Sequence, residues 1–550
     1  MTFRCPVNDQ RLVLDHVVRI GELSNDLEMV GAVLDGAAQF AEGQFAPLDR
    51  IGDTVGSRWV DGKVITPDGF KAAYQVFVEG GWMTLAAPEE FGGQGLPLAL
   101  SAALMEDLNA ANIGFALCPM LSMGAIEALQ HHGSDDLKQR YLAKIVSGDW
   151  TATMNLTEPQ AGSDVGAVKT KAERANDQDG ADGSWRVSGT KIYITYGDHD
   201  LADQIIHLVL ARTPGAPDGT RGISLFLVPK ILPDGSANDL HCVSIEHKLG
   251  IHASPTCVMS YGDAGGAIGW MIGGENQGMR AMFTMMNNAR LNVGLQGVGI
   301  AERATQRAVA YALDRRQNGK AIADHPDVRR MLLRMRALTM GSRALVYYAF
   351  GQIDRAAGGD PLAGYRGDVL TPLAKAWGTD VGCEVASLGI QVHGGMGYIE
   401  ETGAAQHLRD ARIAPIYEGT NGIQAADLVG RKLGLDDGLA FDGLIADIEA
   451  EAQHPMLIAL TDPVEVAVAS LRSADPDDRL AGSYPFLTMC SVMVAGWLVE
   501  RLARAPDATD RDRAAAEFFL GVVVPEAIGL AAGAECGAAM LYAVRAEALA

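Results

Sequence analysis

The spacing of apolar residues changes twice along the chain, and each change predicts a different kind of domain. From about residue 70 to 147 the apolar positions follow a helical period, interrupted by the turn-rich segment PEEFGGQGLP. After Trp150 the chain breaks into short alternating or β-branched runs separated by Gly, Asp, Pro and Asn. We therefore expect an N-terminal helical domain over residues 1–152 and a central β domain over residues 153–275, built as an antiparallel β-barrel or sandwich.

Helical periodicity returns at about Gln277. Within it, apolar residues recur every three or four positions and define one inward-facing side of a helix. They are Leu373, Trp377, Val381, Val385, Leu388 and Val392. The pattern predicts a four-helix bundle over residues 276–435 and an additional C-terminal helical domain over residues 436–550. The expected fold class is a multidomain α+β protein with helical domains on both sides of a β domain.

Composition and charge exclude several classes of function. Hydrophobic residues make up 48% of the chain and charged residues 21%, which is typical of a folded globular protein. A formal net charge of −23 argues against nucleic-acid binding, because phosphate contacts need clustered Lys and Arg. The 7 cysteines include no CxxC pair, which argues against a disulfide framework and a zinc site, so we expect no metal.

The apolar segments favour a protein that stays in the cytoplasm and outside membranes. The N-terminal residues show no basic segment followed by an apolar run and a cleavage site, so we expect no secretion signal. The apolar run from Phe486 to Val499 is shorter than the ~20 residues that a membrane-spanning helix needs. We expect it to form a buried helix.

Two segments at the start of the β region have the residues of a ligand site. In LTEPQAGSD, Thr157 and Ser163 supply short hydroxyls beside a Gly-Ser turn, where backbone N–H groups can approach a polar ring or a phosphate. In TKIYITYG, strand alternation places Tyr193 and Thr195 on the same face. An aromatic ring and a hydroxyl could thus face one ligand.

Two later segments favour a ligand that carries a diphosphate. A predicted helix ends near Arg315, and an arginine forms charge-assisted, often bidentate hydrogen bonds with phosphate groups. The segment QVHGGMGY begins with Gln391 and contains the paired Gly394 and Gly395, which permit close approach of the backbone to a diphosphate.

The segment PIYEGT contains a single carboxylate, Glu418, between an apolar run and a Gly-Thr turn. Burial beside Ile416 and Tyr417 would favour the neutral carboxyl and make its ionised form a stronger base than it is in water. The segment therefore indicates a general base.

These segments and the order of the domains resemble the acyl-CoA dehydrogenases, over about residues 70–435. The resemblance implies FAD as the cofactor and a homodimer or dimer of dimers, because some FAD contacts in this family come from the neighbouring subunit. The positions that match cofactor-binding residues of the family are Thr157, Ser163, Tyr193, Thr195, Arg315, Gln391, Gly394, Gly395 and Thr420.

The resemblance also implies the reaction. Glu418 matches the base that removes the α-proton of an acyl-CoA thioester while a β-hydride passes to the flavin, and its backbone N–H would help to hold the thioester oxygen. The usual electron acceptor in the family is an electron-transferring flavoprotein. The positions that match substrate-binding residues are Ser163, Asn287, Arg290 and Gly419.

Two alternatives share most of these residues. An acyl-CoA oxidase would differ in passing electrons to oxygen, and a largely non-catalytic flavin- and nucleic-acid-binding relative would need a basic tail. Residues 451–550 are acidic, which disfavours that relative. The added C-terminal domain is most similar to a long branch of the family, some members of which act on 3-(methylthio)propanoyl-CoA.

Overall fold

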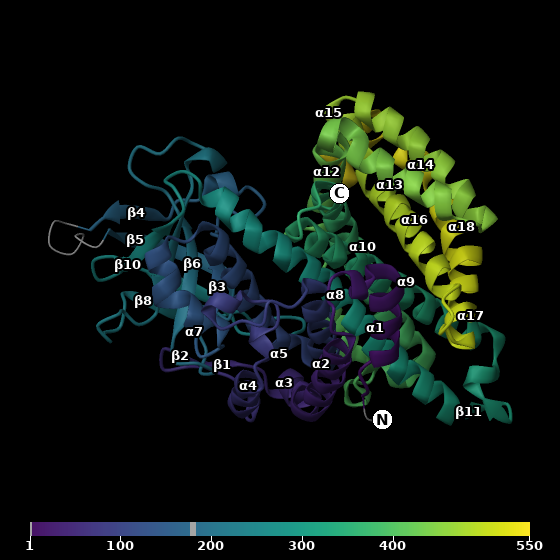
Figure 1. The fold of residues 1–550 in the computed structure, drawn as a ribbon, viewed down its shortest axis with the longest axis horizontal. Helices are drawn as coiled ribbons and strands as arrows, with labels where there is room; N and C mark the ends of the chain where they lie inside the picture. The colour runs from purple at the N-terminus through teal and green to yellow at the C-terminus, as the bar shows by residue number, and fades with distance from the viewer. Residues whose placement is uncertain (1–2, 176–182) are drawn as a thin grey trace. The chain divides into compact units, whose positions relative to one another are not determined.

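The computed structural model describes residues 3–175 and 183–550, and the chain divides into two compact units (Figure 1). One unit, called here the β unit, comprises residues 39–96 and 111–289. The other, the helical unit, comprises residues 1–38, 97–110 and 290–550. Helices α5 (Leu98–His132) and α8 (Gly278–Asp314) contribute residues to both units, and Asn112 has non-helical backbone angles within α5.

The β unit is built around one eight-stranded sheet. Its strands follow the order β3-β6-β7-β10-β5-β9-β8, and β4 pairs with β5. The strands are β3 (Thr151–Asn155), β4 (Lys171–Arg174), β5 (Ser184–Thr195), β6 (Ile205–Ala211), β7 (Ser224–Pro229), β8 (Leu240–Ile245), β9 (Thr256–Tyr261) and β10 (Ala267–Ile272). The remaining elements of the unit include α3 (Asp49–Val55), the hairpin β1 (Arg58–Val60) and β2 (Lys63–Ile65), α4 (Phe70–Glu79), α6 (Asp135–Leu137) and α7 (Ala143–Val146).

The central β domain is confirmed, but the sheet differs from the expected antiparallel barrel. Within the part of the chain that the structure describes, the sheet stays open, with β3 and β8 at the two ends of its order. β3 also runs parallel to β6, with Thr151 opposite Ile205 and Asn155 opposite Val209. The sequence pattern predicts strands and their spacing, whereas a parallel pair depends on long connections that the pattern does not encode.

Apolar side chains of several strands form the core of the sheet. Trp185 packs edge-on against Phe226, with ring centroids 5.5 Å apart. The cluster also contains the buried residues Val187, Val209, Val228, Cys257 and Met259. Burial of each such side chain stabilises the fold by about 1.5–3 kcal/mol. This core holds β5, which carries two of the predicted cofactor-binding residues.

Long helices dominate the helical unit, which confirms the expectation of helical N-terminal and C-terminal regions. Two long helices lie wholly within this unit and pack against each other, α9 (Pro326–Ala357) and α10 (Pro361–His393). The shorter helices of the N-terminal region and around the PIYEGT segment are α1 (Val7–Val13), α2 (Leu27–Phe40), α11 (Ala404–Ala411) and α12 (Asn421–Gly430). Asp360 caps α10 by accepting a hydrogen bond from the Leu362 N–H at 3.0 Å.

A buried ion network ties the long helices together. Arg343 of α9 donates to Glu106 of α5 at 2.8 Å and to Glu302 of α8 at 2.9 Å. The Tyr347 hydroxyl donates to the other Glu106 oxygen at 2.7 Å. Because all four side chains are buried, removing one partner would leave an uncompensated charge or polar group at a cost of about 3–5 kcal/mol.

The C-terminal extension consists mainly of helices. They pack against one another and against α9, α10 and α12 (Figure 1). Its helices are α13 (Leu439–Glu451), α14 (Pro455–Ser473), α15 (Pro476–Ala481), α16 (Ser483–Ala503), α17 (Asp510–Phe518), α18 (Val524–Ile528), α19 (Ala531–Ala534) and α20 (Ala538–Leu541). Two helices, α5 and α16, are long and apolar enough to cross a membrane by composition, but 89% and 83% of their apolar windows are buried within the protein. Both have the burial of core helices.

Candidate active site

The PIYEGT segment forms a tight turn between α11 and α12. The N–H groups of Ile416 and Tyr417 both donate to Ile413 O, at 2.9 and 3.1 Å. Thr420 then caps α12, because its hydroxyl accepts a hydrogen bond from the Ile423 N–H at 3.1 Å. Glu418 is thereby held between a hydrogen-bonded turn and a capped helix.

Two successive residues of this turn have left-handed backbone conformations. Glu418 has φ +56° and Gly419 has φ +82°. A non-glycine residue in this region costs of order 1–3 kcal/mol, and such strain gathers at functional sites. At Gly419 the left-handed φ favours glycine, and a Cβ there would also lie 2.8 Å from Gln424 Nε2.

The environment of Glu418 shifts the titration of its carboxyl towards neutral pH. Burial raises the pKa of Glu418 from its usual 4.5 to about 7, although the positive charges of Arg290 and Lys375 act in the opposite direction. The side chain is half-buried, so it keeps some access to solvent. A carboxyl with this pKa and this access can take up a proton from a ligand at physiological pH.

Lys375 lies beneath the turn and is the cation that the sequence reading did not single out. It is fully buried in α10, and its ammonium donates to Asn421 Oδ1 at 2.9 Å. Burial lowers the pKa of Lys375 to about 7, while Glu418 and Asp380 act to raise it. In sequence it stands in the apolar run LAKAW, 43 positions before Glu418, where nothing in the local pattern indicates a site.

Two further side chains flank Glu418. The Tyr417 hydroxyl donates to Gln296 Oε1 of α8. Burial and the charge of Glu418 raise the pKa of Tyr417, so its hydroxyl stays protonated. Arg290 of α8 is buried and its Nε lies 3.5 Å from Glu418 O, a long contact. Burial lowers the pKa of Arg290, against the effect of Asp427 and Glu418. The helical unit thus brings together Arg290, Glu418, Gly419 and Thr420 of the predicted residues.

The β unit brings together the first two predicted cofactor segments. The Ile192 N–H of β5 donates to Thr157 O at 2.9 Å, and the Thr153 hydroxyl donates to Thr195 O at 2.7 Å. Ser163 follows in an exposed part of the same loop. The loop and strand therefore lie side by side, as a shared ligand site requires.

A β-bulge exposes Tyr193, and strand alternation alone does not predict it. The register of β5 against β9 shifts between Lys191 and Ile194, and Tyr193 has φ +60°. Its side chain is 59% exposed, an unusual position for a large aromatic ring in a sheet. The backbone at Tyr193 is therefore strained while its ring is exposed, and bulges commonly re-aim a side chain at a site.

A buried ion pair that the sequence reading missed fixes this part of the β unit. Lys191 donates to Glu158 Oε1 at 2.8 Å, and both side chains are buried. Burial acts to raise the pKa of Glu158. Lys191 and the hydrogen-bond donors on Thr170 and Lys169 act more strongly in the opposite direction and lower this pKa to about 2. The pair anchors the loop of Thr157 to the strand of Tyr193.

The remaining predicted residues lie at helix ends and on α8. Arg315 is exposed just after α8, and Gln391 is exposed near the end of α10. Gly394 has φ +60°, and a Cβ at Gly394 or Gly395 would meet nothing within 4 Å, so this turn leaves room for a ligand against its backbone. Asn287 of α8 is half-buried. Exposed cationic, amide and open glycine positions fit the diphosphate of a dinucleotide cofactor.

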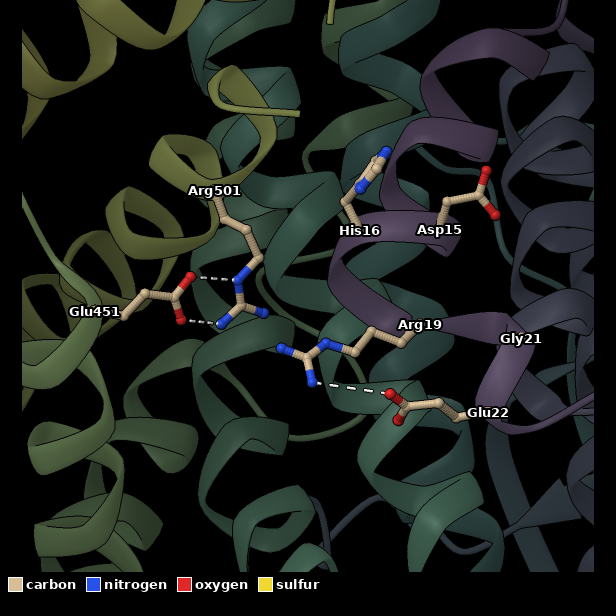
Figure 2. Close-up of a pocket in the computed structure, with 7 residues that line it drawn as sticks. All are labelled: Asp15, His16, Arg19, Gly21, Glu22, Glu451 and Arg501. Atoms are coloured by element: carbon tan, nitrogen blue, oxygen red, sulfur yellow. Dashed lines mark hydrogen bonds and ion pairs between the residues drawn. The ribbon is translucent and has the colours of Figure 1, made fainter. Parts of the chain in front are cut away.

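A separate cavity of about 490 Å³ lies elsewhere in the helical unit (Figure 2). It is lined by Asp15, His16, Arg19, Gly21, Glu22, Glu451 and Arg501. Figure 2 shows the carboxylate of Glu451 facing the guanidinium of Arg501, whose Nε donates to Glu451 Oε1 at 2.8 Å and whose Nη2 donates to Oε2 at 2.5 Å. Two pairs of its lining residues form ion pairs, Arg19 with Glu22 and Arg501 with Glu451, and none of the predicted site residues line it.

Family models match most of the chain between residues 32 and 433, and two relatives match more than nine tenths of it. Models of the N-terminal, middle and C-terminal domains of acyl-CoA dehydrogenases match residues 32–149, 153–264 and 276–433. The 3-methylmercaptopropionyl-CoA dehydrogenase of Ruegeria pomeroyi is 46% identical, with 94% of each chain covered. The broad-specificity linear acyl-CoA dehydrogenase FadE5 of Mycobacterium tuberculosis is 33% identical, over 91% of this chain and 90% of its own.

Solved structures show the same fold. Caenorhabditis elegans ACDH-11 in complex with C11-CoA has a TM-score of 0.81 at 22% identity, with 94% of this chain and 91% of that chain covered. An acyl-CoA dehydrogenase from Bacillus anthracis complexed with FAD has a TM-score of 0.76 at 22% identity, with 94% and 88% covered. Both likenesses extend through the C-terminal region as well as the central domains.

Proposed function

Because this chain belongs to the acyl-CoA dehydrogenase family, we propose that Glu418 is the base that removes the α-proton of its acyl-CoA substrate. The protein is an FAD-dependent oxidoreductase that acts on a CH–CH bond. The observation that carries the proposal is the setting of Glu418: a strained turn, partial access to solvent and a pKa of about 7. A base with this pKa is half ionised at neutral pH, where proton transfer is most effective.

The proton and electron balance of the reaction assigns each group a role. The Glu418 carboxylate takes the α-proton and becomes a neutral carboxyl, and a double bond forms between the α and β carbons. FAD, when bound, accepts the β-hydride at its N5 atom. The backbone N–H of Glu418, with Gly419 beside it, would stabilise the negative charge that develops on the thioester oxygen.

The positions that match cofactor contacts of the family would hold FAD. Thr157, Ser163, Tyr193, Thr195 and Thr420 would contact the flavin. Arg315, Gln391, Gly394 and Gly395 would contact the diphosphate region of a neighbouring subunit's FAD. Support comes from the bulge that exposes Tyr193 and from the open glycine turn after α10. Ser163, Asn287 and Arg290 would contact the CoA thioester.

For the acyl group, we propose 3-(methylthio)propanoyl-CoA. The support is the 46% identity over 94% of the chain to a protein named for that substrate. A straight-chain acyl-CoA is the second candidate, because the 33% identical relative is named for linear substrates.

The partners follow from the same family. We propose an electron-transferring flavoprotein as electron acceptor, a homodimer or dimer of dimers as the assembly and the cytoplasm as the location. We also propose that α8, α9, α10 and α12 constitute the bundle of a third domain over residues 276–435, next to domains over 1–152, 153–275 and 436–550.

An anaerobic titration tests the proposed substrate. The purified protein with bound FAD is mixed with equal concentrations of 3-(methylthio)propanoyl-CoA and of straight-chain acyl-CoAs, and bleaching of the flavin absorbance is followed. The proposal predicts the highest second-order rate of bleaching with the methylthio thioester. A higher rate with butanoyl-CoA or a longer chain would assign the site to linear substrates, and no bleaching with any thioester would refute the dehydrogenase reaction.

A further inference from the structure

We propose that Tyr484, in the C-terminal extension, is a positioning residue for Glu418 and acts through a chain of hydrogen bonds. The inference rests on the proposed role of Glu418 as the base. It gives the extension a part in the reaction, because Tyr484 lies in α16, well beyond the segments that carry the predicted site residues.

The first link joins the extension to α10. The Tyr484 hydroxyl donates to Asp380 Oδ2 at 2.6 Å. Hydrogen bonds from a hydroxyl to a carboxylate are stronger than those between neutral groups, and a distance of 2.6 Å is typical of them. Tyr484 is the second residue of α16, so the beginning of this helix is held at Asp380.

The second link runs from Asp380 to the first residue of α12. Asn421 Nδ2 donates to Asp380 Oδ1 at 2.9 Å, and Asn421 Oδ1 accepts from Lys375 Nζ at 2.9 Å. The carboxylate only accepts and the ammonium only donates, so together they fix one orientation of the Asn421 amide. Asn421 is buried and stands three residues after Glu418, so this orientation fixes the end of the turn that carries the base.

The same hydrogen-bonded residues also affect one another's pKa values. Burial raises the pKa of Asp380, whereas the hydrogen bonds from Tyr484 and Asn421 lower it and so help to keep it ionised. The negative charge of Asp380 helps to keep Lys375 protonated, and the positive charge of Lys375 lowers the pKa of Glu418. Loss of the Tyr484 hydroxyl would therefore favour neutral Asp380, then neutral Lys375, and would raise the pKa of Glu418.

Other charged groups lie near these hydrogen-bonded residues and are kept in Tyr484→Phe. Arg290 acts on Glu418, and Arg412 acts on Asp380. The further titratable or charged groups near these residues are Tyr417, Cys383, Asp427 and Arg431. Tyr484 donates directly to Asp380 Oδ2, so the predicted direction of the shift follows from loss of that hydrogen bond.

A second polar contact between the extension and α10 provides a matched control. Asp447 of α13 forms an ion pair with Arg366 of α10 at 2.6 Å. Arg366 stands 14 positions before Asp380, which is about 21 Å along the helix. Asp447→Asn weakens attachment of the extension without touching the chain to Glu418. Any effect of Tyr484→Phe that comes only from looser attachment should appear in Asp447→Asn as well.

The test is the pH dependence of anaerobic flavin reduction at low acyl-CoA concentration, which reports the pKa of the base in the free enzyme. The probe is the acyl-CoA that bleaches the wild-type flavin fastest. Tyr484→Phe should move the acid limb of the profile to higher pH by ~0.5 unit or more. Asp380→Asn should move it in the same direction, Tyr484→Phe in that background should add little, and Asp447→Asn should leave it in place.

The outcomes separate this inference from the proposed function. If Tyr484→Phe and Asp380→Asn both keep the wild-type limb, the inference is overturned even though Glu418 remains the base. If Asp447→Asn shifts the limb as much as Tyr484→Phe does, the extension acts only by its attachment and the positioning role is overturned. If Glu418→Gln reduces its flavin at the wild-type rate, the proposed function itself fails.

Discussion

The ammonium of Lys375 donates a hydrogen bond to Asn421 Oδ1 at 2.9 Å, and both side chains are buried beneath the turn that carries Glu418. A buried lysine with no charge nearby would become neutral. Here Glu418 and Asp380 favour its charged form, which leaves its pKa at about 7. Lys375 and Glu418 therefore titrate over the same pH range and influence each other.

Replacement of Lys375 should change the pH at which the base works. In Lys375→Met the positive charge that stabilises ionised Glu418 is lost, so the pKa of Glu418 rises and less of it is ionised at pH 6. The acid limb of anaerobic flavin reduction should move to higher pH by about one unit. Lys144→Met, which removes a lysine paired with Asp149 at 2.9 Å in the β unit, is the control and should keep the wild-type limb. An unshifted limb in Lys375→Met would show that its charge does not act on the base.

The free energy of unfolding should depend on pH because the pKa of Glu418 is raised in the folded protein. Its folded-state pKa is about 7 and its ordinary value is 4.5, so between these values the folded state binds more protons than the unfolded state. The resulting stabilisation is complete below pH 4.5 and is lost as the pH rises through 7, a change of about 3 kcal/mol.

Glu418→Gln removes this dependence, because glutamine does not titrate. Thermal unfolding midpoints of the variant and the wild type should be similar near pH 4.5, and the variant should unfold at a higher temperature at pH 8. Equal midpoints at both pH values would mean that Glu418 has an ordinary pKa in the folded protein.

Gly419 should be far less tolerant of substitution than a glycine three positions later. Gly419→Ala introduces a Cβ at φ +82° that would lie 2.8 Å from Gln424 Nε2. The backbone is strained for alanine there, and either the turn or Gln424 must shift, so the rate of flavin reduction should fall at least tenfold. Gly422→Ala is the matched control, since its Cβ would meet only Thr420 Oγ1 at 3.7 Å within a helix. Similar rates in the two variants would contradict the strict geometry assigned to the turn.

Much of the fold could be predicted from local patterns. Apolar periodicity located the helices around α5 and α10 and the run of strands after Trp150. The segments around Thr157, Tyr193 and Glu418 could be found because glycines, hydroxyls and an isolated carboxylate interrupt those patterns. Local sequence carries this information directly.

The rest of the site depends on contacts between distant residues. Lys375 stands in an apolar helical run and Tyr484 in the extension, so neither signals a role before the chain folds. The bulge at Tyr193 comes from the register of β5 against β9, which alternation alone cannot give. The open sheet and its parallel β3–β6 pair likewise depend on non-local pairing.

The rate of anaerobic flavin reduction in Glu418→Gln, compared with wild type at equal FAD content, tests the central claim most directly. Loss of a general base typically slows a reaction by about 10²–10⁴-fold, so the variant should keep its FAD and its absorbance spectrum while bleaching slower by that factor. A rate within about threefold of wild type would contradict the assignment of Glu418 as the base.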